Sequence, residues 1–182
     1  QCMLHEGEID SYETSEDGGL SLRGLYEGKM GYAYTEKLDE DSIAFLIDSV
    51  KKNASILDED DGTDIFEGSS DYETHSFYND DLETIDFSDK IELLRSIEKK
   101  IRAYDSRIVT LDYCMMGQFT TERSLLNSKA LSLSQKVNGL IIYLSVVVKD
   151  GDEMKTAGYR IMTRDFASLH AEDIAKEAAE QA

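Results

Sequence analysis

The chain has 182 residues, and its 41% hydrophobic content is enough to build one large domain or two small ones. It carries 38 Asp and Glu residues against 19 Lys and Arg, which gives a formal net charge of -19. A surface of this sign repels phosphates and anionic lipid headgroups, so neither direct nucleic-acid binding nor membrane binding is expected.

The two cysteines, Cys2 and Cys114, are too few for a disulfide framework or a zinc-ligand set. No apolar run reaches transmembrane length, and no basic-then-apolar signal opens the chain. We therefore expect a cytoplasmic location. The first residue is not Met and the last predicted helix has no terminator, so we also expect a fragment of a longer protein.

Residues 1–35 predict a meander of three or four short strands, because turn signals recur at Glu6-Gly7, at 17–19 and at Glu27-Gly28. After Leu38 the apolar spacing changes to a helical period. Ile43, Leu46, Ile47 and Val50 follow an acidic start, which predicts a helix from about Asp39 to about Ala54.

Residues 53–89 hold 13 of the 38 acidic residues and no Lys or Arg. We predict that 55–87 is an acidic surface connection, with high exposure, little regular structure and no ordered cation over 58–86. A calcium loop is the alternative, since Ca²⁺ is bound by carboxylates at alternate positions, as in Asp58 and Asp60 before Gly62. The remaining ligands and the closing Glu are missing, which favours the plain loop.

A second helix is predicted to begin near Ser88, with Phe87 as a hydrophobic staple. Its apolar face is expected to hold Ile91, Leu94, Ile97, Ile101 and Tyr104. Its polar face is expected to hold Arg95, Glu98, Lys99, Lys100 and Arg102.

Residues 108–162 predict an antiparallel meander, on which the rest of the fold depends. We expect strands at 108–116, 119–126, 137–149 and 154–163, with a break at Gly117 and a hairpin turn at 150–152. A third helix is predicted over 171–182. The resulting class is α+β, a largely antiparallel sheet of two meanders, with the 43–50 and 91–104 helices packed on one side of it.

No catalytic constellation is complete. His5-Glu6 begins the H-E-x-x-H zinc pattern, but position 9 is Ile9. His75 and His170 have no evident partners in the sequence, and Cys114 is expected to pack as a small apolar group.

Asp112 with Asp10 and Glu13 forms a weak acid/base candidate, because carboxylates are abundant everywhere in this chain. Four tyrosines are expected to pack on the sheet and not to line a site: Tyr32, Tyr34, Tyr143 and Tyr159. We assign no catalytic, cofactor-binding or metal residue.

Residues 18–35, GGLSLRGLYEGKMGYAYT, resemble the block "G-x-R-v…d-G-k-x-G-y-a-y-t" of the TldD/PmbA family. Asp105-Ser106-Arg107-Ile108, Asn127-Ser128, the 145–158 hairpin and Arg164-Asp165 are also similar to that family's N-terminal half. The resemblance covers nearly the whole chain and makes residues 1–182 an N-terminal domain. The long acidic connection resembles the PmbA (TldE) branch more than TldD.

The resemblance implies a cytoplasmic metallopeptidase system for proteolysis that matures or degrades peptides such as microcin precursors, whose members are also called modulators of DNA gyrase. It implies zinc on an H-E-x-x-x-H motif in the C-terminal half of TldD-type members, with PmbA-type members as partner subunits. Position 10 here is Asp10, so no catalytic residue transfers to this chain. We expect a scaffold domain that is inactive alone, with a homo- or heterodimeric partner and a possible peptide substrate.

The alternative is a stand-alone acidic interaction module whose sheet edge accepts a strand from a partner. The length of the parent reading frame separates the two hypotheses, since only the first requires a C-terminal half.

Overall fold

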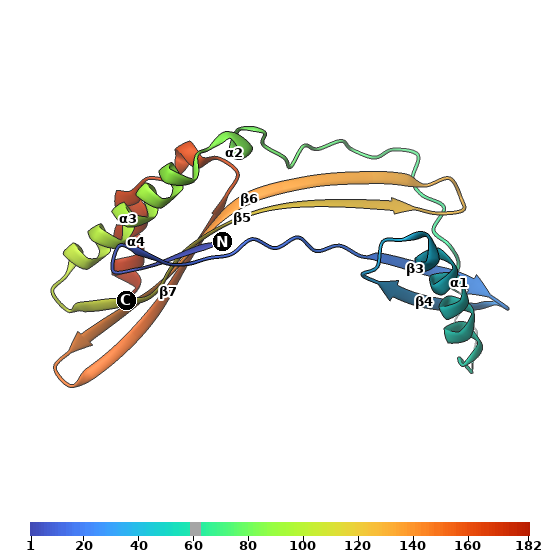
Figure 1. Cartoon of the computed structure of the whole chain (residues 1–182), viewed down its shortest axis with the longest axis horizontal. Helices are drawn as coiled ribbons and strands as arrows, with labels where there is room; N and C mark the ends of the chain where they lie inside the picture. The colour runs from blue at the N-terminus through green and yellow to red at the C-terminus, as the bar shows by residue number, and fades with distance from the viewer. Residues whose placement is uncertain (59–62) are drawn as a thin grey trace. The chain divides into compact units, whose positions relative to one another are not determined.

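A computed structural model of the protein describes residues 1–58 and 63–182 (Figure 1). The described strands are β1 (Cys2–His5), β2 (Glu8–Tyr12), β3 (Leu20–Tyr26), β4 (Lys29–Thr35), β5 (Ile108–Leu126), β6 (Ser132–Asp150) and β7 (Glu153–Thr163). The described helices are α1 (Glu40–Ser55), α2 (Asp81–Thr84), α3 (Phe87–Tyr104) and α4 (Ala171–Gln181), with one 3-10 turn, η1 (Phe166–Ser168).

The chain forms two compact units. The larger unit comprises Gln1–Thr14, Thr74–Arg123 and Gln135–Ala182, and the smaller comprises Ser15–Glu73 and Ser124–Ser134. In the described residues no helix is both long and apolar enough to span a membrane.

The larger unit is built on a five-stranded sheet with the strand order β2-β1-β5-β6-β7. β6 and β7 form a long antiparallel hairpin in which Leu140 pairs with Thr163 and Asp150 with Glu153. β1 joins β5 over two residues only, where Cys2 faces Met116 and Met3 faces Met115. The N-terminal hairpin is therefore attached to the main sheet by a short stretch of pairing.

Helices α3 and α4 cover one face of this sheet (Figure 1). Leu94, Ile97 and Ile101 of α3 are fully buried, as are Ile174, Ala175 and Ala178 of α4 to within a few per cent. They pack on alternate residues of the sheet: Cys114, Met116, Leu140, Ile142, Leu144 and Val146. This alternation is what a strand with one face in a core requires.

The smaller unit packs α1 on the β3-β4 hairpin. Asp39 caps the helix, since its Oδ1 accepts a hydrogen bond of 3.0 Å from the Ser42 amide. The core is small and consists of Ala33, Leu46 and Val50, with Leu22 packed against it. Gly31 allows close approach, because a Cβ there would lie 2.1 Å from the Val50 carbonyl oxygen.

The predicted α+β class and its antiparallel pairing are confirmed. The prediction that both long helices pack on one sheet is wrong, because α1 packs on β3-β4 and α3 on the five-stranded sheet. The prediction that residues 1–35 form one meander is also wrong. β1 and β2 join the large sheet, while β3 and β4 form a sheet of their own.

Three details of the predicted elements also differ. Gly117 does not break β5, which continues through it. A Cβ at position 117 would lie 3.2 Å from Cγ2 of Ile141, so the glycine leaves room for the Ile141 side chain. Ile43 and Ile47 are exposed, because the buried face of α1 runs through Ser42, Leu46, Val50 and Ala54. Tyr104 is exposed and donates a hydrogen bond to Glu180.

The acidic connection is mostly exposed and irregular where it is described, as predicted. Two findings depart from the prediction: α2 forms a short helix, and its Leu82 is fully buried. A basic partner also exists, since Lys129 bonds both Asp64 and Glu67. Of the residues that suggested a calcium loop, Asp58 is exposed, while Asp60 and Gly62 lie outside the described residues.

We predict that Gly31→Ala destabilises the smaller unit by about 1–3 kcal/mol, because the added methyl group meets backbone that cannot rotate away. Urea unfolding followed by circular dichroism measures the change. Gly18→Ala is the matched control, since a Cβ there meets only the Leu38 side chain at 3.5 Å. Equal unfolding midpoints for the two variants would contradict the prediction.

Candidate functional site

The three histidines lie on separate elements and all are exposed. His5 ends β1, His75 lies in the acidic connection, and His170 precedes α4. Ile9 pairs with Leu4 across the β1-β2 hairpin, so His5-Glu6 lies in a strand and a turn, not on a helix as a zinc motif would. Among residues 1–58 and 63–182, no three His, Cys, Asp or Glu side chains gather as metal ligands would.

Both cysteines are free and buried. Burial raises the pKa of the Cys114 thiol to about 12, and the nearby Glu98 carboxylate contributes in the same direction. Burial also raises the pKa of the Cys2 thiol. Since the thiolate is the nucleophile, neither side chain is activated for nucleophilic chemistry.

The weak acid/base candidate remains without support. Asp10 and Asp112 are exposed, and Glu13 accepts a hydrogen bond of 3.0 Å from the Gln1 amide.

Two of the four tyrosines pack on the large sheet as predicted. Tyr143 contacts Tyr113 at a ring-centroid distance of 5.8 Å, and Tyr159 donates a hydrogen bond of 2.8 Å to Glu177 of α4. Tyr32 and Tyr34 are half exposed on β4.

A buried carboxylate on α3 was missed by the sequence analysis. Glu98, predicted to be solvated, is 2% exposed. Its Oε2 accepts a hydrogen bond of 2.8 Å from the Gly7 amide, and its Oε1 accepts two from Arg102, at 3.0 and 2.9 Å. The Arg102 spacing of four residues was visible in the sequence, but the turn that supplies the other donor lies far away in the chain.

The turn that Glu98 holds has an unusual backbone. Glu6 and Gly7 both have positive φ, 52° and 80°. Arg95 donates a hydrogen bond of 2.7 Å to the Gly7 carbonyl oxygen, so α3 bonds both the backbone N–H and the backbone C=O of Gly7. These contacts fix the β1-β2 hairpin on α3, which matters because the hairpin has only two paired residues on β5.

A second polar cluster attaches the end of the acidic connection to β6. Asn138, which is 1% exposed, accepts a hydrogen bond from the Asn79 amide at 2.9 Å and donates one to the Asn79 carbonyl at 2.8 Å. Its Nδ2 also donates to Glu83, which accepts a further bond from Thr120. The bond from Asn138 is the main reason that the pKa of Glu83 is lowered.

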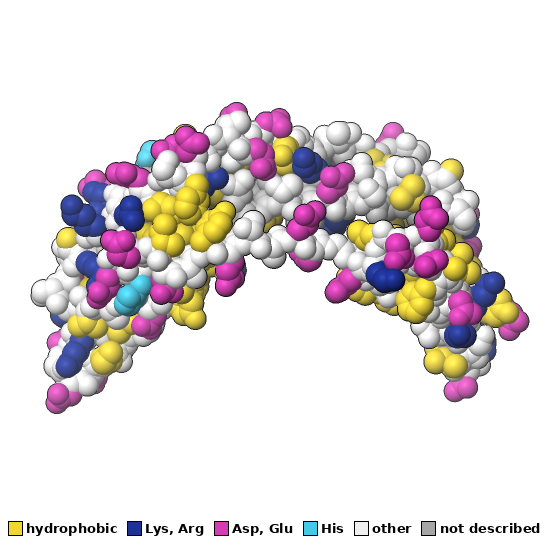
Figure 2. Space-filling view, in the orientation of Figure 1, with side chains coloured by type: hydrophobic (Ala, Val, Ile, Leu, Met, Phe, Trp, Pro, Cys, Tyr) yellow, Lys and Arg dark blue, Asp and Glu magenta, His cyan; other side chains and the backbone are white. Residues whose placement is uncertain are grey.

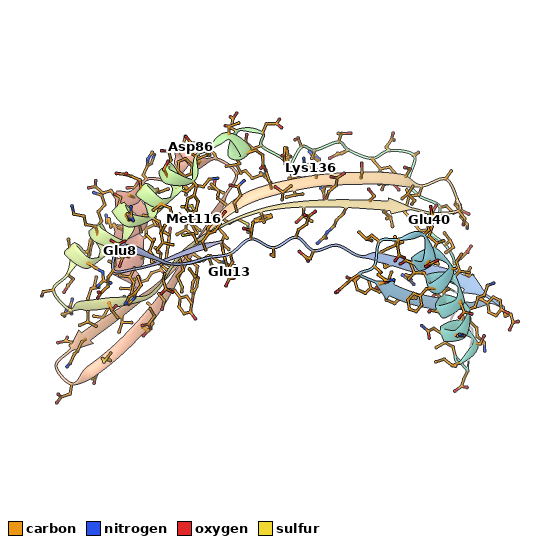
Figure 3. The ribbon with its side chains drawn as sticks, viewed as in Figure 1. Glu8, Glu13, Glu40, Asp86, Met116 and Lys136 are labelled. Carbon is orange, nitrogen blue, oxygen red and sulfur yellow. The ribbon has the colours of Figure 1, made fainter. Side chains whose placement is uncertain are left out.

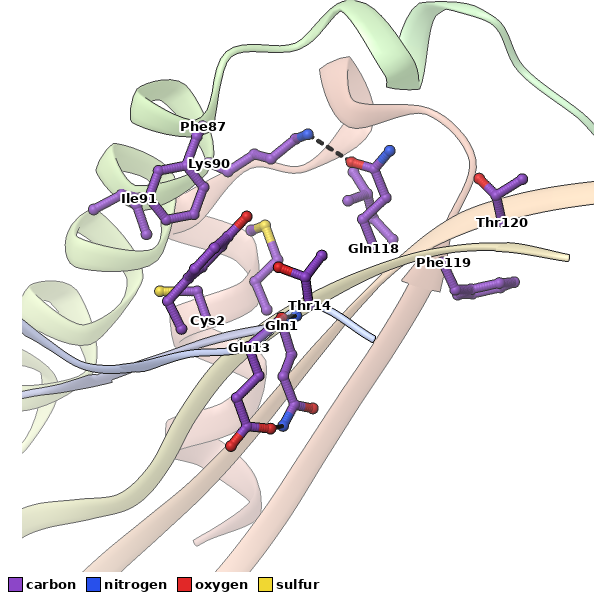
Figure 4. A pocket seen from close by; sticks show the side chains of 13 residues that line it. Gln1, Cys2, Glu13, Thr14, Phe87, Lys90, Ile91, Gln118, Phe119 and Thr120 are labelled. Carbon is purple, nitrogen blue, oxygen red and sulfur yellow. Dashed lines mark hydrogen bonds between the residues drawn. The ribbon is translucent and has the colours of Figure 1, made fainter. Parts of the chain in front are cut away.

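One pocket of about 280 Å³ lies in the larger unit, between the start of α3 and the strands β1, β2 and β5 (Figure 4). Its walls are largely apolar and include Tyr12, Phe87, Ile91, Met116 and Leu140. Tyr12 and Phe87 meet edge to face at 4.9 Å. Figure 2 shows hydrophobic side chains exposed beside α3 near the N-terminus, and Figure 3 places Met116 on the sheet there.

Lys90 and Glu13 are the charged side chains among the residues that line this pocket. The Nζ of Lys90 donates a hydrogen bond of 2.5 Å to the Gln118 side chain, drawn as a dashed line in Figure 4. Burial lowers the pKa of Lys90, although Glu83 and Asp86 oppose the shift. Gln118 in turn donates to the Leu82 carbonyl oxygen at 3.3 Å. The pocket can therefore accept an apolar group beside a partly desolvated cation.

The face of the five-stranded sheet opposite α3 and α4 is also apolar. Ile141 pairs with Met162 and Tyr143 with Arg160 on this face, and Phe119 lies over Gly139. Tyr113 and Met162 are 51% and 60% exposed. By strand alternation the face holds the odd residues of 113–121 and 139–147 and the even residues of 156–162. Among these positions of β5, β6 and β7, Arg160 is the one charged residue, while the β1-β2 hairpin brings Glu8, paired with His5, to the same face.

This fold defines an α+β domain with antiparallel sheets, in which helices cover one face of the larger sheet. Two family models match the sequence: the PmbA/TldA metallopeptidase central domain over residues 80–182 and PmbA/TldA metallopeptidase domain 1 over residues 3–54. The chain therefore belongs to the PmbA/TldD metallopeptidase family. No curated protein matches its sequence significantly.

Solved structures share the fold at low sequence identity. A proposed modulator of a DNA gyrase from Thermotoga maritima has a TM-score of 0.81 at 20% identity over 99% of this chain. TldE from Thermococcus kodakarensis has a TM-score of 0.79 at 20% identity over 98%. A proposed modulator of DNA gyrase from Bacteroides thetaiotaomicron has a TM-score of 0.80 at 17% identity over 98%.

This chain spans 40%, 40% and 41% of the length of those three structures, respectively. The two matched models do not coincide with the two compact units, because Gln1–Thr14 packs with the residues of the central-domain match.

We predict that Glu98→Ala destabilises the larger unit by about 3–5 kcal/mol, because it leaves the Gly7 amide and the Arg102 guanidinium without their buried acceptor. Chemical denaturation measures the loss. Glu92→Ala on the exposed face of α3 is the control and should change stability by no more than about 0.5 kcal/mol. A small loss at Glu98 would show that the carboxylate is not needed to hold the hairpin.

We predict that Cys114 resists alkylation by iodoacetamide at pH 8 in the folded chain and reacts at once in denaturant. At that pH the thiol is almost wholly protonated, since its pKa of about 12 lies far above the solution pH, and it is 1% exposed. Mass spectrometry of the labelled peptide follows the reaction. Rapid labelling of Cys114 in the native chain would refute its assignment as an inert core residue.

Proposed function

We propose that this chain is the N-terminal scaffold and assembly domain of a PmbA/TldD-type peptidase system that processes or degrades peptides. In this proposal the catalytic metal ligands come from another domain or from a partner subunit. The observation that carries the proposal is the open apolar face of the five-stranded sheet. Family membership supplies the peptidase context, and the face supplies a surface for assembly.

The composition of that face supports assembly. In an antiparallel sheet with one face exposed to solvent, apolar and polar residues alternate along each strand. In β6 the residues from Leu140 to Val148 are mostly apolar on both faces of the strand. In a chain with 38 acidic residues, this face carries none between its Tyr113 and Met162 margins. Exposed apolar patches that exclude charge are typical of protein interfaces.

The residues of this chain do not fit the zinc site that the family name implies. A zinc peptidase needs about three protein ligands and an open position for water. His5, His75 and His170 are exposed on separate elements, and Asp10 occupies the position of the second His in an H-E-x-x-x-H reading from His5. We therefore derive no catalytic step through zinc for these residues.

Partners and location follow as parts of the same proposal. We infer a homo- or heterodimeric assembly with a PmbA/TldD-type subunit, because one fold relative is a TldE. Assignment to the PmbA branch, a role in microcin maturation and a connection with gyrase stay predictions. The free, buried state of Cys2 and Cys114 supports a cytoplasmic location.

Measurements of zinc content and of peptide hydrolysis test whether the catalytic metal site lies outside this chain. The isolated chain is expected to bind no stoichiometric zinc and to leave an unstructured fluorogenic peptide intact, while a family subunit carrying H-E-x-x-x-H cleaves it. Stoichiometric zinc and cleavage by the isolated chain, both lost when His5, His75 and His170 are replaced, would place the active site in this chain and overturn the proposal.

We predict that Tyr113→Glu on the open face weakens copurification with such a subunit by at least about tenfold, because assembly would bury an unpaired carboxylate. The exposed Tyr72→Glu is the matched control, since Tyr72 lies in the acidic connection and is not one of the residues of the face. Retained assembly of the Tyr113 variant would exclude this face as the contact surface.

A further inference from the structure

We propose that a polar pocket between α3 and the turn of the β1-β2 hairpin binds a carboxylate group of a peptide ligand. The choice of a peptide rests on the proposed function, since a peptidase system handles peptides. The choice of a carboxylate rests on the charges of the pocket alone.

The polar pocket lies where α3 holds the hairpin turn. It has a volume of about 390 Å³ and is lined by six residues: Glu6, Gly7, Arg95, Glu98, Lys99 and Arg102. The three cations follow one another along α3 at intervals of four and three residues, so they lie on one face of the helix. Their grouping at one pocket runs against the net charge of the chain, which is -19.

These cations have donors that the protein does not use. Arg95 donates from Nε to the Gly7 carbonyl oxygen, and Arg102 donates from Nε and Nη2 to Glu98. Neither terminal nitrogen of Arg95, nor Nη1 of Arg102, donates to another described residue. The exposed Lys99 ammonium forms no hydrogen bond or ion pair in the described part of the chain.

The existing hydrogen bonds also prepare the pocket for a ligand. Because Arg95 is bonded to the hairpin turn and Arg102 to the buried Glu98, both guanidinium groups are held in place before a ligand arrives. Ordering a long side chain is one of the costs of binding, and that cost is reduced here. A guanidinium group with free N–H donors is also well suited to a carboxylate.

The two carboxylates of the pocket determine which anion fits. Both oxygens of Glu98 accept hydrogen bonds from Gly7 and Arg102, so its charge is compensated within the protein, while Glu6 is exposed. Three cations against two carboxylates leave the pocket with one net positive charge. A single carboxylate matches this charge. A phosphate dianion would leave an uncompensated negative charge in the field of an acidic chain.

NMR titration of the ¹⁵N-labelled full chain tests the site, because chemical shifts report weak binding and its location. The first probe is a short N-acetylated peptide of alternating glycine and alanine with a free C-terminal carboxylate. The second is the same peptide with an amidated C-terminus. The third is amidated and has one glutamate in place of an alanine, which distinguishes a side-chain carboxylate from a terminal one.

We expect the first or the third probe to shift the signals of the Gly7 amide and the Arg95 Nε–H in a saturable way. The second probe should bind at least about tenfold more weakly, because it has no charge for the cations to pair with. Equal binding of all three probes would overturn the proposal. Tighter binding of inorganic phosphate than of either carboxylate probe would also overturn it.

Protein variants test whether the pocket is the binding site. Lys99→Gln should weaken binding by about threefold, the size expected of one solvent-exposed ion pair. Lys100→Gln is the matched control, since it changes the net charge equally at the next residue of α3, which pairs with Glu172 and does not line the pocket. Both side chains are exposed, so both variants are expected to fold. Equal effects of the two substitutions would show that only the net charge matters and would reject the site.

The outcome is separable from that of the proposed function. Assembly with a catalytic subunit without carboxylate binding by this chain would reject the pocket as a site and leave the scaffold role in place. Carboxylate binding by a chain that forms no assembly would reject the scaffold role and leave the site in place.

Discussion

Burial of one face of α3 against the five-stranded sheet is the interaction on which the larger unit depends. Leu94, Ile97 and Ile101 are each fully buried, and each such side chain contributes roughly 1.5–3 kcal/mol relative to exposure. The same face carries Glu98, so the helix that supplies the core also supplies the acceptor for the N-terminal hairpin. Its first turns, with Phe87, Lys90 and Ile91, form a wall of the pocket. The stability of the larger unit and the shape of its pocket therefore both depend on where α3 lies against the sheet.

Glu98 shows why a polar group is tolerated in that core. A buried carboxylate is costly unless its lone pairs are satisfied, and here both oxygens have donors. A hydrophobic residue at this position could pack, but it could not hold the Gly7 amide, and β1 has only two paired residues on β5. The carboxylate thus fixes the position of β1, whose Cys2 reaches the pocket.

Local patterns predicted most of the elements. The helical periods behind Asp39 and near Ser88 located α1 and α3, and the β-branched run at 140–148 located the centre of β6. Pattern alone could not decide which elements share a sheet. β1 pairs with β5, more than a hundred residues away, and β2 joins the sheet through β1; no local period in the sequence indicates these contacts.

The missed polar groups have the same cause. In the sequence, Glu98 cannot be distinguished from a solvent-exposed glutamate of an amphipathic helix, because its hydrogen bond to the Gly7 amide forms only in the folded chain. The burial of Asn138 likewise depends on a partner far away in the sequence, since its side chain accepts a hydrogen bond from the Asn79 amide. The pocket also combines residues from β1, β2, α3, β5 and β6, so no single stretch of sequence could have indicated it.

Acidic residues are unevenly distributed along the chain. Residues 53–89 hold 13 of the 38 carboxylates, while the open sheet face between Tyr113 and Met162 holds none. An apolar face whose strands β5 to β7 contribute a single charge, Arg160, lowers the desolvation cost of docking a second protein layer. The partner that this composition favours is thus another apolar protein surface.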